Sequence, residues 1–529
     1  MENKKRTYLL PLALAGCVIV GILIGQSMLS AGNNYASNSS YGELEYQKIQ
    51  DIIKILDSRY VDNVDGDSLF ETAIGDMLHK LDPHSNYIPA KDLALANEQI
   101  QGEFAGVGVR FLILKDTICV TNVIEQSPAE MAGLKAGDKI VKVDKTITAK
   151  NKTSNDKVMA LLKGPTGTKV NVTVLRDGKK LNKIITRGAI PINSIISSYM
   201  IDSKTGFIKI DQFSLNTTRE FRSAAAKLLK QGMTQMVLDL RNNGGGVLGS
   251  ATQIADEFLR TNKVIVSTKG EHSKEMKYMS TNVGMLENTK LVVLINENSA
   301  SASEILAGAL QDNDRAVIVG RRSFGKGLVQ EDVQLRDGSN LRLTIARYYT
   351  PTGRCIQKPY NGNMSDYYHE QSDRYDNGEL YAPDSTLFVD SLKYKTPKGK
   401  IVYGGGGIMP DIFVALDTSG SSWYLAELRY SMAFQSFAFD FVRNKRNLWN
   451  SAQHFAKSFI VSDDILKSFT NYGVINYSIP FKQREFNASK TLMKTVLKAE
   501  IARQIWTENG YYQVINQTDK ELLKALQQF

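Results

Sequence analysis

The chain has 529 residues, of which 42% are hydrophobic and 23% are charged. This length exceeds what one hydrophobic core supports, and the composition is that of folded protein, so we expect roughly three or four domains. The net charge of +10 is spread along the sequence, which argues against nucleic acid as a partner. Three cysteines and five histidines are too scattered for a disulfide framework or a zinc motif, so the sequence predicts no metal and no cofactor.

The amino terminus carries a candidate membrane segment. The sequence KKR precedes an uncharged apolar run from Tyr8 to Leu29, which is long enough to cross a bilayer core. Basic residues ahead of such a run predict a cytoplasmic start and a body on the outer side. The run is longer than the apolar part of most signal peptides, so we favour an uncleaved anchor. The sequence LAGC, which ends at Cys17, leaves a lipoprotein cleavage box as the alternative.

A polar linker completes residues 1–43, and residues 44–101 have a helical pattern. The sequence YQKIQDIIKILDSRY places its isoleucines on one broad face, as in an amphipathic helix. A second helical pattern, SLFETAIGDMLHKL, precedes the turn LDPHSNYIP. His84 lies in this turn, and we interpret it as structural because nothing nearby completes a catalytic or metal set.

Strand periodicity replaces helical periodicity over residues 102–188. Segments such as TICVTNVI and KVNVTVL are separated by glycine-bearing turns, with one helix near residues 155–163. The order of SPAEMAGLKAGDKIVKVD resembles the PDZ domain in the permuted form of bacterial proteases, and a plain small β-barrel is the alternative. In the PDZ interpretation the GVGV sequence binds a peptide carboxylate through free backbone N–H groups. The residues expected to contact a substrate tail are Gly106, Val107, Gly108, Val109, Leu161 and Leu162.

Short apolar strands alternate with helices from residue 189 to residue 415. MVLDL and KLVVLIN are examples, and the alternation is typical of an α/β layer architecture. Residues 360–400 are polar and tyrosine-rich, so we expect a surface insertion there. The chain becomes helical again over residues 416–529, as a helical appendage. The aromatic side chains expected in the core of this appendage are Trp423, Phe434, Phe437 and Phe441.

Lys326 lies in the segment RAVIVGRRSFGKGLVQEDVQL, and three motifs compete for it. GRRSFGK matches a phosphate-binding loop, but such a loop needs Ser or Thr next, followed by a helix. Here Gly327 follows, and LVQEDVQLRDGSNLRLTIARYY predicts a β-hairpin. SFGK matches the S-x-x-K motif of penicillin-binding enzymes, but Gly325 and the strand-like neighbours disfavour the helix which that motif needs.

The third interpretation makes Lys326 the base for a serine in ENSASASEIL. Lysine ordinarily titrates near about 10.4, and burial can lower its pKa by several units because it disfavours the charged form. Phe324 and the adjoining apolar strands can provide such a pocket, and Gln330 can hold the amine by a hydrogen bond. A Ser-Lys pair needs no histidine, which suits a chain whose histidines are few and scattered.

These stretches together resemble the carboxy-terminal processing, or tail-specific, protease family. The resemblance covers about residues 44–415 and depends on LDLRNNGGG, SASASEILAGALQDNDRAVIVG, SFGKGLVQ, ARYYTPTGR and the PDZ segment. It implies a multidomain α+β protein whose α/β protease core is of the crotonase/ClpP-like type. It also implies that Ser301 is the nucleophile, Lys326 the base and Gln330 the third member of the site, with Asp312 in a supporting role in some members.

The position of Ser301 also favours it over Ser299 and Ser303. It falls between the end of the strand LVVLIN and a helix expected from Glu304, so its hydroxyl can face a cleft beside free helix N–H groups. One oxyanion donor is typically worth about 3 to 4 kcal/mol of barrier. The expected donors are the amides of Ala302 and of Gly244 or Gly245 in the glycine turn.

The sequence therefore predicts a serine endopeptidase that cleaves proteins near their C-termini. Its PDZ domain would capture apolar C-terminal tails, and its anchor would hold the body in the periplasm on the inner membrane of a bacterial cell envelope. A non-catalytic PDZ receptor for protein tails is the alternative. The helical segments 44–101 and 416–529 could serve a homodimer or an adaptor protein, and the sequence does not choose between these partners.

Overall fold

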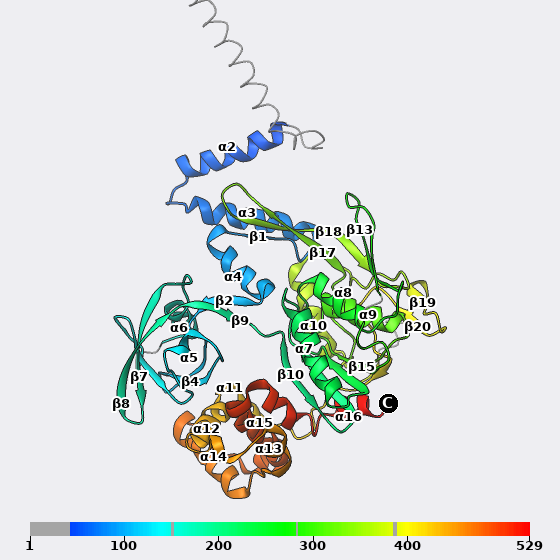
Figure 1. Ribbon diagram of the computed structural model, residues 1–529. Coiled ribbons are helices and arrows are strands. Elements are labelled where there is room, and N and C mark those ends of the chain that lie inside the picture. Colours follow the sequence, from blue (N-terminus) through cyan, green and yellow to red (C-terminus); the bar gives the residue numbers. More distant parts are fainter. Residues whose placement is uncertain (1–42, 150–152, 282–283, 384–388) are drawn as a thin grey trace, which may run out of the picture. The chain divides into compact units, whose positions relative to one another are not determined.

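The computed structural model describes residues 43–149, 153–281, 284–383 and 389–529 (Figure 1). The chain divides into two compact units, one up to Ile74 and one from Gly75 onward. The predicted membrane segment and Cys17 lie outside the described residues. Among the helices within the described ranges, none has both the length and the apolar character needed to cross a membrane.

The helices expected over residues 44–101 are present. Helix α2 carries Ile49, Ile52 and Ile55 with half or more of each side chain exposed, so its apolar face is not covered within the first unit. In the second unit, a short strand follows and pairs with strand β18 (Asn340–Tyr349). The elements of this segment are α2 (Glu43–Arg59), α3 (Gly66–Leu81), β1 (Asn86–Ile88) and α4 (Ala90–Gln101).

The region expected to be a PDZ domain forms a small antiparallel sheet with two helices. The strand order is β3-β4-β5-β7-β8, β6 pairs with β5, and β2 pairs with β9. A separate core of valine, isoleucine and leucine side chains fills it. Its elements are β2 (Glu103–Gly106), β3 (Val109–Leu114), β4 (Thr117–Val123), α5 (Pro128–Met131), β5 (Lys139–Val143), β6 (Thr146–Ile147), α6 (Asn155–Leu162), β7 (Lys169–Arg176), β8 (Lys179–Thr186) and β9 (Gly188–Pro191).

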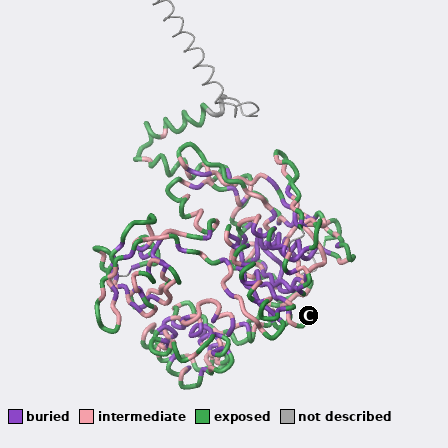
Figure 2. Tube along the Cα trace, in the orientation of Figure 1, coloured by how far each residue is buried: buried purple, intermediate pink, exposed green. Residues whose placement is uncertain are grey.

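The α/β region is built on a sheet of order β10-β11-β12-β15-β16-β21. Every neighbouring pair from β11 to β21 is parallel, so the carboxyl ends of these strands meet at one edge of the sheet. Figure 2 shows buried residues gathered around this sheet and its helices. The elements are β10 (Ile195–Met200), β11 (Thr205–Ile210), α7 (Thr217–Lys230), β12 (Gln235–Asp239), α8 (Leu248–Asp256), β15 (Lys290–Ile295), α9 (Ala302–Asp312), β16 (Val317–Gly320) and β21 (Ile412–Phe413).

A second sheet carries the hairpin predicted after Lys326. Strands β17 and β18 pair antiparallel from Leu328–Arg347 to Gln334–Asn340, and β18 also pairs with β1 and β13. A strand, not a helix, thus follows the glycine-lysine sequence, which excludes the phosphate-loop and S-x-x-K helix geometries. The elements of this sheet beside β1 are β13 (Val264–Lys269), β14 (Met276–Met279), β17 (Leu328–Gln334) and β18 (Asn340–Tyr349).

Residues 360–400, predicted as a surface insertion, are mostly exposed over the helix in their first half, but two side chains of that helix are buried. Helix α10 (Met364–Asp376) buries Tyr367 and Arg374 against the protease core. The charged residues of this segment suggest an exposed surface when only the sequence is considered. In the fold they are paired, and pairing is the condition for burying charged side chains. The remaining elements are η2 (Asp390–Leu392), β19 (Lys393–Lys395) and β20 (Ile401–Tyr403).

The carboxyl-terminal region is helical, as predicted, and it has its own core around Phe434. Trp423 is an exception, because 82% of it is exposed. Phe437 and Phe441 are partly buried against that core. The elements are α11 (Trp423–Tyr430), α12 (Ala433–Val442), η3 (Arg446–Leu448), α13 (Ala452–Ser458), α14 (Asp463–Tyr477), α15 (Gln483–Ile515, interrupted at Trp506 and Thr507) and α16 (Lys520–Leu526).

Helix α16 belongs to the α/β core and not to an appendage. Leu522 and Ala525 pack in one buried cluster with side chains of the main sheet. Glu521 accepts a hydrogen bond of 3.0 Å from Arg241 and also pairs with Arg321. These arginines lie just after β12 and β16, so the last helix of the chain supports two of the loops at the carboxyl edge of the sheet.

Candidate active site

The three serines of SASAS differ in what surrounds their hydroxyls. Ser299 is fully buried and donates to the carbonyl of Leu240 at 2.8 Å. Ser303 is also fully buried and donates to the carbonyl of Asn243 at 2.9 Å. Ser301 alone of the three is partly exposed, and it lines a cavity of about 550 Å³. The hydroxyl of Ser301 is therefore the one that a substrate could reach.

Ser301 is held in an uncommon backbone conformation at the amino terminus of α9. Its φ is 54° and its ψ is −113°, in a region that non-glycine residues rarely occupy and that clusters at functional sites. The helix begins at Ala302, two residues earlier than the sequence predicts. The amide of Ala302 has no acceptor among the described residues, as expected for an N–H in the first turn of a helix, and it is the amide next to Ser301 in the chain.

The glycine turn after β12 lies directly against Ser301. A Cβ on Gly245, whose φ is 103°, would come within 2.7 Å of the Ala300 carbonyl oxygen and 2.8 Å of Ser301 Cβ. The amide of Gly245 already donates to Asn243 Oδ1 at 2.9 Å. Gly244 lines the cavity, and its amide has no acceptor among the described residues. Of the two expected oxyanion donors in this turn, the geometry therefore favours Gly244.

Lys326 and Gln330 line the same cavity as Ser301. Lys326 Nζ donates to Gln330 Oε1 at 3.1 Å, and the Gln330 amide group donates to the backbone carbonyl of His84. Because Gln330 is fixed through its nitrogen, its oxygen points at the amine. No direct hydrogen bond joins the Ser301 hydroxyl to Lys326 Nζ among the described residues.

Burial lowers the pKa of Lys326, and the positive charge of Arg342 on β18 lowers it further. Asp82 and Glu304 act in the opposite direction and favour the charged amine. Burial and the charge of Lys326 also lower the pKa of His84 to about 3, so this imidazole is neutral at physiological pH. The surroundings thus favour a lysine that gives up its proton more readily than a solvated one.

Glu304 connects the Ser301 and Lys326 segments, and sequence reasoning missed it. Its carboxylate is buried and accepts from the amide of Ser301 at 2.8 Å and from the amide of Lys326 at 2.9 Å. It also accepts from the amide of Gly325 at 2.7 Å and from the Ser323 hydroxyl at 2.6 Å. The sequence does contain a signal for this residue, because an acidic residue three positions after a helix-capping serine is typical of a capping box. The distant groups that Glu304 binds cannot be read from the sequence.

Tyr348 of β18 makes a second connection between these segments. Its buried hydroxyl contacts the carbonyl of Lys326 and lies 3.2 Å from the carbonyl of Ser301. The cavity wall beside Ser301 is otherwise largely aliphatic, with Arg342 and Asp332 at the hairpin. The apolar side chains of this wall are Ile100, Val247, Leu248, Ile305, Leu328 and Val329.

Asp312 lies at the opposite end of α9 from Ser301. It pairs with Arg354 at 2.7 Å, and both side chains are fully buried. Its other oxygen accepts from the Thr352 hydroxyl at 2.6 Å. The aspartate therefore attaches the carboxyl end of α9 to the TPTGR turn, and its place in the structure is that of a supporting group outside the cavity.

The GVGV residues form the connection between β2 and β3. The amides of Val107 and Gly108 have no acceptor among the described residues, as a carboxylate-binding loop requires. Gly108 has a φ of 84°, and a Cβ there would come within 2.3 Å of Ser127 Cβ. Gly106 ends β2 and pairs with Gly188. The loop backbone is thus compatible with the predicted role.

The apolar residues predicted to line the tail pocket divide into two kinds. Val107 and Leu162 are 3% and 4% exposed and belong to the domain core, so little of either side chain is accessible to a tail in this conformation. Val109 and Leu161 are partly buried at the edge of that core. These two remain the candidates for contact with a tail.

Comparisons with known proteins agree with these regions. Residues 204–367 match the model of peptidase family S41, and residues 105–185 match the PDZ domain. Residues 24–92 match the "Activating protease CtpB N-terminal domain", and residues 424–507 match a family of unknown function.

The chain is also similar to individual proteins. It is 36% identical to the carboxy-terminal-processing protease of Bartonella bacilliformis over 348 residues, which is 64% of this chain and 79% of that protein. It is 34% identical to a probable CtpA-like serine protease of Staphylococcus aureus, covering 64% of this chain and 70% of that protein. A photosystem II D1 C-terminal processing protease structure is 32% identical, covers 58% of this chain and 89% of its own, and has a TM-score of 0.33. The chain belongs to the carboxy-terminal-processing proteases of peptidase family S41 and is a serine-type peptidase with a PDZ domain.

Proposed function

We propose that this protein is an endopeptidase that cleaves proteins near their C-termini, with Ser301 as nucleophile and Lys326 as general base. The observation that carries the proposal is the shared cavity: Ser301, Lys326, Gln330 and Gly244 come from loops after three parallel strands and from the hairpin, and they line one space. Ligand sites of α/β sheets lie at this edge. A polypeptide backbone is the natural ligand for a cavity with a hydroxyl, an amine and free amides.

The reaction begins when neutral Lys326 takes the proton of Ser301 as Oγ attacks the scissile carbonyl carbon. The negative charge that develops on the carbonyl oxygen is stabilised by the amides of Ala302 and Gly244. The lysine ammonium then gives its proton to the leaving amine, and an acyl-enzyme remains. Water attacks this ester with Lys326 as base again, the acid is released, and Ser301 recovers its proton.

Gln330 orients the amine of Lys326. Its oxygen accepts from Nζ at 3.1 Å, which occupies one N–H and leaves the lone pair of the neutral amine to face the cavity. Without that bond the four-carbon stem of lysine is flexible. In the described conformation the amine is bonded to Gln330 and not to Ser301, so the first step requires Nζ and the hydroxyl to come within hydrogen-bonding distance.

The PDZ domain supports selection of substrates by their ends. We propose that the amides of Val107 and Gly108 bind the terminal carboxylate of the substrate and that Val109 and Leu161 contact its last apolar side chain. When a peptide binds to this kind of loop, main-chain hydrogen bonds provide the affinity and side-chain pockets provide the specificity.

Location is proposed from the amino-terminal sequence alone. The basic start and the apolar run from Tyr8 to Leu29 favour an inner-membrane anchor with the body in the periplasm, with a lipid on Cys17 as the alternative. Fractionation of cells with and without residues 1–30 tests this point: a full-length chain that stays in the soluble fraction contradicts a tether.

The test of the catalytic proposal compares Ser301→Ala and Lys326→Ala with the wild-type chain on an unfolded protein with an apolar tail. We expect both variants to lose turnover by about 10³-fold or more, while circular dichroism and tail binding stay at wild-type values. Retention of turnover in either variant contradicts the dyad. Inactivity of the wild-type chain toward every denatured protein, together with tail binding, would instead support a receptor that binds tails without cleaving them.

A further inference from the structure

The loop that carries Lys326 has no regular structure of its own. It runs between the end of β16 and the start of β17, and residues 322–327 belong to neither strand. A general base is effective only when its position is fixed, because a displacement of about 1 Å can cost about 10²-fold in rate. The fold must therefore hold this loop through its backbone.

Two charged side chains bind the loop through opposite kinds of backbone group. Glu304 of α9 accepts from the amides of Gly325 and Lys326. Arg374 of α10 donates to three carbonyls that come just before them, those of Arg322 at 3.3 Å, Ser323 at 2.9 Å and Phe324 at 3.2 Å. Arg374 is 1% exposed, so these bonds are shielded from water and are strengthened by the charge.

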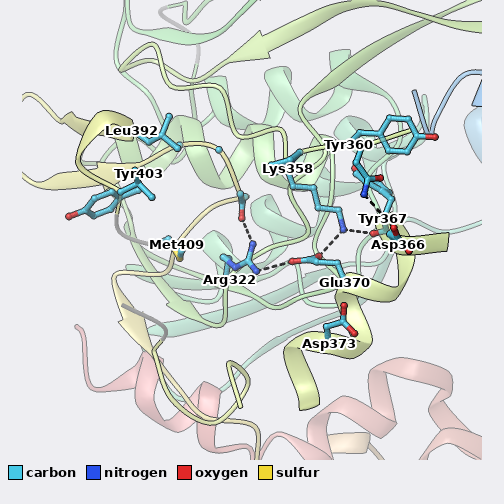
Figure 3. A pocket seen from close by; sticks show the side chains of 17 residues that line it. Arg322, Lys358, Tyr360, Asp366, Tyr367, Glu370, Asp373, Leu392, Tyr403 and Met409 are labelled. Atoms are coloured by element: carbon cyan, nitrogen blue, oxygen red, sulfur yellow. Dashed lines mark hydrogen bonds and ion pairs between the residues drawn. The ribbon is translucent and has the colours of Figure 1, made fainter. Parts of the chain in front are cut away.

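Glu370, one turn before Arg374 on α10, holds this arginine in place. Its carboxylate accepts from Arg374 Nε at 2.8 Å, from Arg322 at 3.0 Å and from Lys358 at 2.8 Å. Figure 3 shows Glu370 between Arg322 and Lys358, with dashed contacts to both. Burial raises the pKa of Glu370, but Arg374 and Lys358 outweigh it and hold the pKa down at about 2, so the carboxylate is charged at neutral pH.

Close packing limits how far the loop can shift. A Cβ on Gly325 would lie 3.1 Å from Lys358 Cβ and 3.2 Å from the amide nitrogen of Gly407. Lys358 Nζ lies 4.1 Å from the ring centre of Phe324 and 4.2 Å from that of Tyr367, both favourable cation–π distances. Removal of Arg374 therefore leaves the loop surrounded by packed groups but without a donor for three of its carbonyls.

We propose that Arg374 is a positioning residue for the general base, and that α10 holds the Lys326 loop through its carbonyls while Glu304 holds it through its amides. The proposal rests on the proposed role of Lys326. It assigns a purpose to a segment whose sequence looks like an unrelated surface insertion. Arg374 touches neither substrate nor reacting atoms, and it acts through the backbone of Arg322, Ser323 and Phe324.

Loss of these bonds should change the surroundings of the amine as well as its position. The groups that face Lys326 are Arg342 on β18, Asp82 and His84 ahead of β1, Gln330 on β17 and Glu304 on α9. If the loop relaxes toward solvent, water contacts the Lys326 amine more than before. This hydration favours the ammonium form. The rate constant kcat should fall, and the pH at which activity reaches its plateau should rise.

The experiment uses the full-length chain with Arg374→Lys and Arg374→Met. Lysine keeps the charge but cannot reach three carbonyls with one compact ammonium group. Arg315→Met is the matched control, because Arg315 also donates to three backbone carbonyls, those of Phe258, Leu286 and Thr289, elsewhere in the same core. We expect Arg374→Lys to lower kcat by about 10- to 100-fold with KM changed less than about threefold, and Arg315→Met to lower the unfolding midpoint while kcat stays near wild type.

A second measurement does not depend on turnover. In the Ser301→Ala background, the pKa of Lys326 is measured by the pH dependence of its acetylation with acetic anhydride, read by mass spectrometry. We expect Arg374→Lys to move this pKa upward by about one unit or more toward the ordinary lysine value, and Arg315→Met to leave it unchanged. If Arg374→Met does not fold, Arg374→Lys decides the matter alone.

Equal kcat losses in Arg374→Lys and Arg315→Met, or a Lys326 pKa that Arg374→Lys does not move, would overturn the proposal. A failure of the proposed catalytic function would give a different experimental result. That failure would appear as wild-type turnover in Lys326→Ala, whatever happens at Arg374.

Discussion

Two glycine-rich loops lie where this protein is expected to meet a substrate backbone, and they are held in different ways. The turn at residues 242–246 contacts Ser301 through backbone atoms and is fixed by the side chain of Asn243. The GVGV loop at residues 106–109 is fixed by the packing of Gly108 on Ser127 and by the bond from the Ala129 amide to the Val107 carbonyl. Beside the first loop, the buried carboxylate of Glu304 accepts from the amide of Ser301. Beside the second loop, the neighbouring side chains form an aliphatic core.

The difference follows from what each loop has to do. Covalent chemistry depends on distances controlled to a fraction of an ångström, and charged hydrogen bonds in a dry site supply directional control. Recognition of a tail needs free N–H groups and an adaptable apolar contact. Four experiments test this contrast, and their expected effects decrease in the order given.

Glu304→Gln should have the largest effect. Glutamine presents one acceptor oxygen and one amide nitrogen, and each carboxylate oxygen of Glu304 now accepts from two donors. Two buried donors then lose their acceptor, at about 1 to 3 kcal/mol each. We expect a lower unfolding midpoint and a loss of kcat of about 10²-fold or more, measured by calorimetry and peptide cleavage.

Asp312→Asn is the matched control for this variant. It also neutralises a buried carboxylate of α9, but at the end that binds Arg354. We expect reduced stability with kcat close to wild type. A kcat loss as large as that of Glu304→Gln would mean that α9 acts as one unit and that Glu304 has no special link to the site.

Gly245→Ala should come next, and Gly244→Ala is its control. An alanine at 245 needs a positive φ of 103° and places Cβ 2.7 Å from the carbonyl oxygen of Ala300, so the turn must move away from Ser301. A Cβ at 244 meets no atom within 4 Å. We expect cleavage to fall about 10²-fold in the first variant and only slightly in the second; similar losses in both would refute the distinction drawn between the two glycines.

The pH profile should show a smaller, graded effect. The proposed base, Lys326, is active as the neutral amine, so log kcat/KM should rise with unit slope as pH increases and level off above its pKa. Burial and Arg342 lower this pKa, so the plateau should begin below the ordinary lysine value of about 10.4. Arg342→Gln removes one of these causes and should shift the profile to higher pH, while a profile governed by an inflection at or above the ordinary value contradicts a buried base.

Leu161→Ala and Leu162→Ala separate recognition from stability in the PDZ domain. Leu162 is 4% exposed, and its truncation should cost about 2 to 5 kcal/mol of domain stability. Leu161 is partly buried at the edge of the core, so its truncation should weaken tail binding a few-fold with little loss of stability. Fluorescence titration with an apolar-tailed peptide measures the tail affinity, and thermal unfolding measures the stability of the domain. Unchanged tail affinity in Leu161→Ala would exclude Leu161 from the tail site.

Local sequence was sufficient for the features that depend on neighbouring residues. The hairpin after Lys326 could be predicted because alternation and a turn sequence are local signals, and the same signals excluded a phosphate loop. The strand–turn–helix order around SASAS, together with the resemblance to the protease family, favoured Ser301 over Ser299 and Ser303 as the nucleophile. The paired PDZ and protease stretches indicated the family.

The tertiary structure decided everything that depends on partners distant in sequence. The hydroxyls of Ser299 and Ser303 donate to backbone carbonyls of the loop after β12. Ser301 is therefore the one of these three serines that lines the cavity. The amide of Gly245 is bonded and that of Gly244 is not. Arg374 and Glu304 look like surface charges in the sequence, and they become positioning groups only because the fold removes them from water and gives each a set of backbone partners. Burial and hydrogen-bond pairing are properties of the folded chain, and they determine which of several chemically equivalent residues can act.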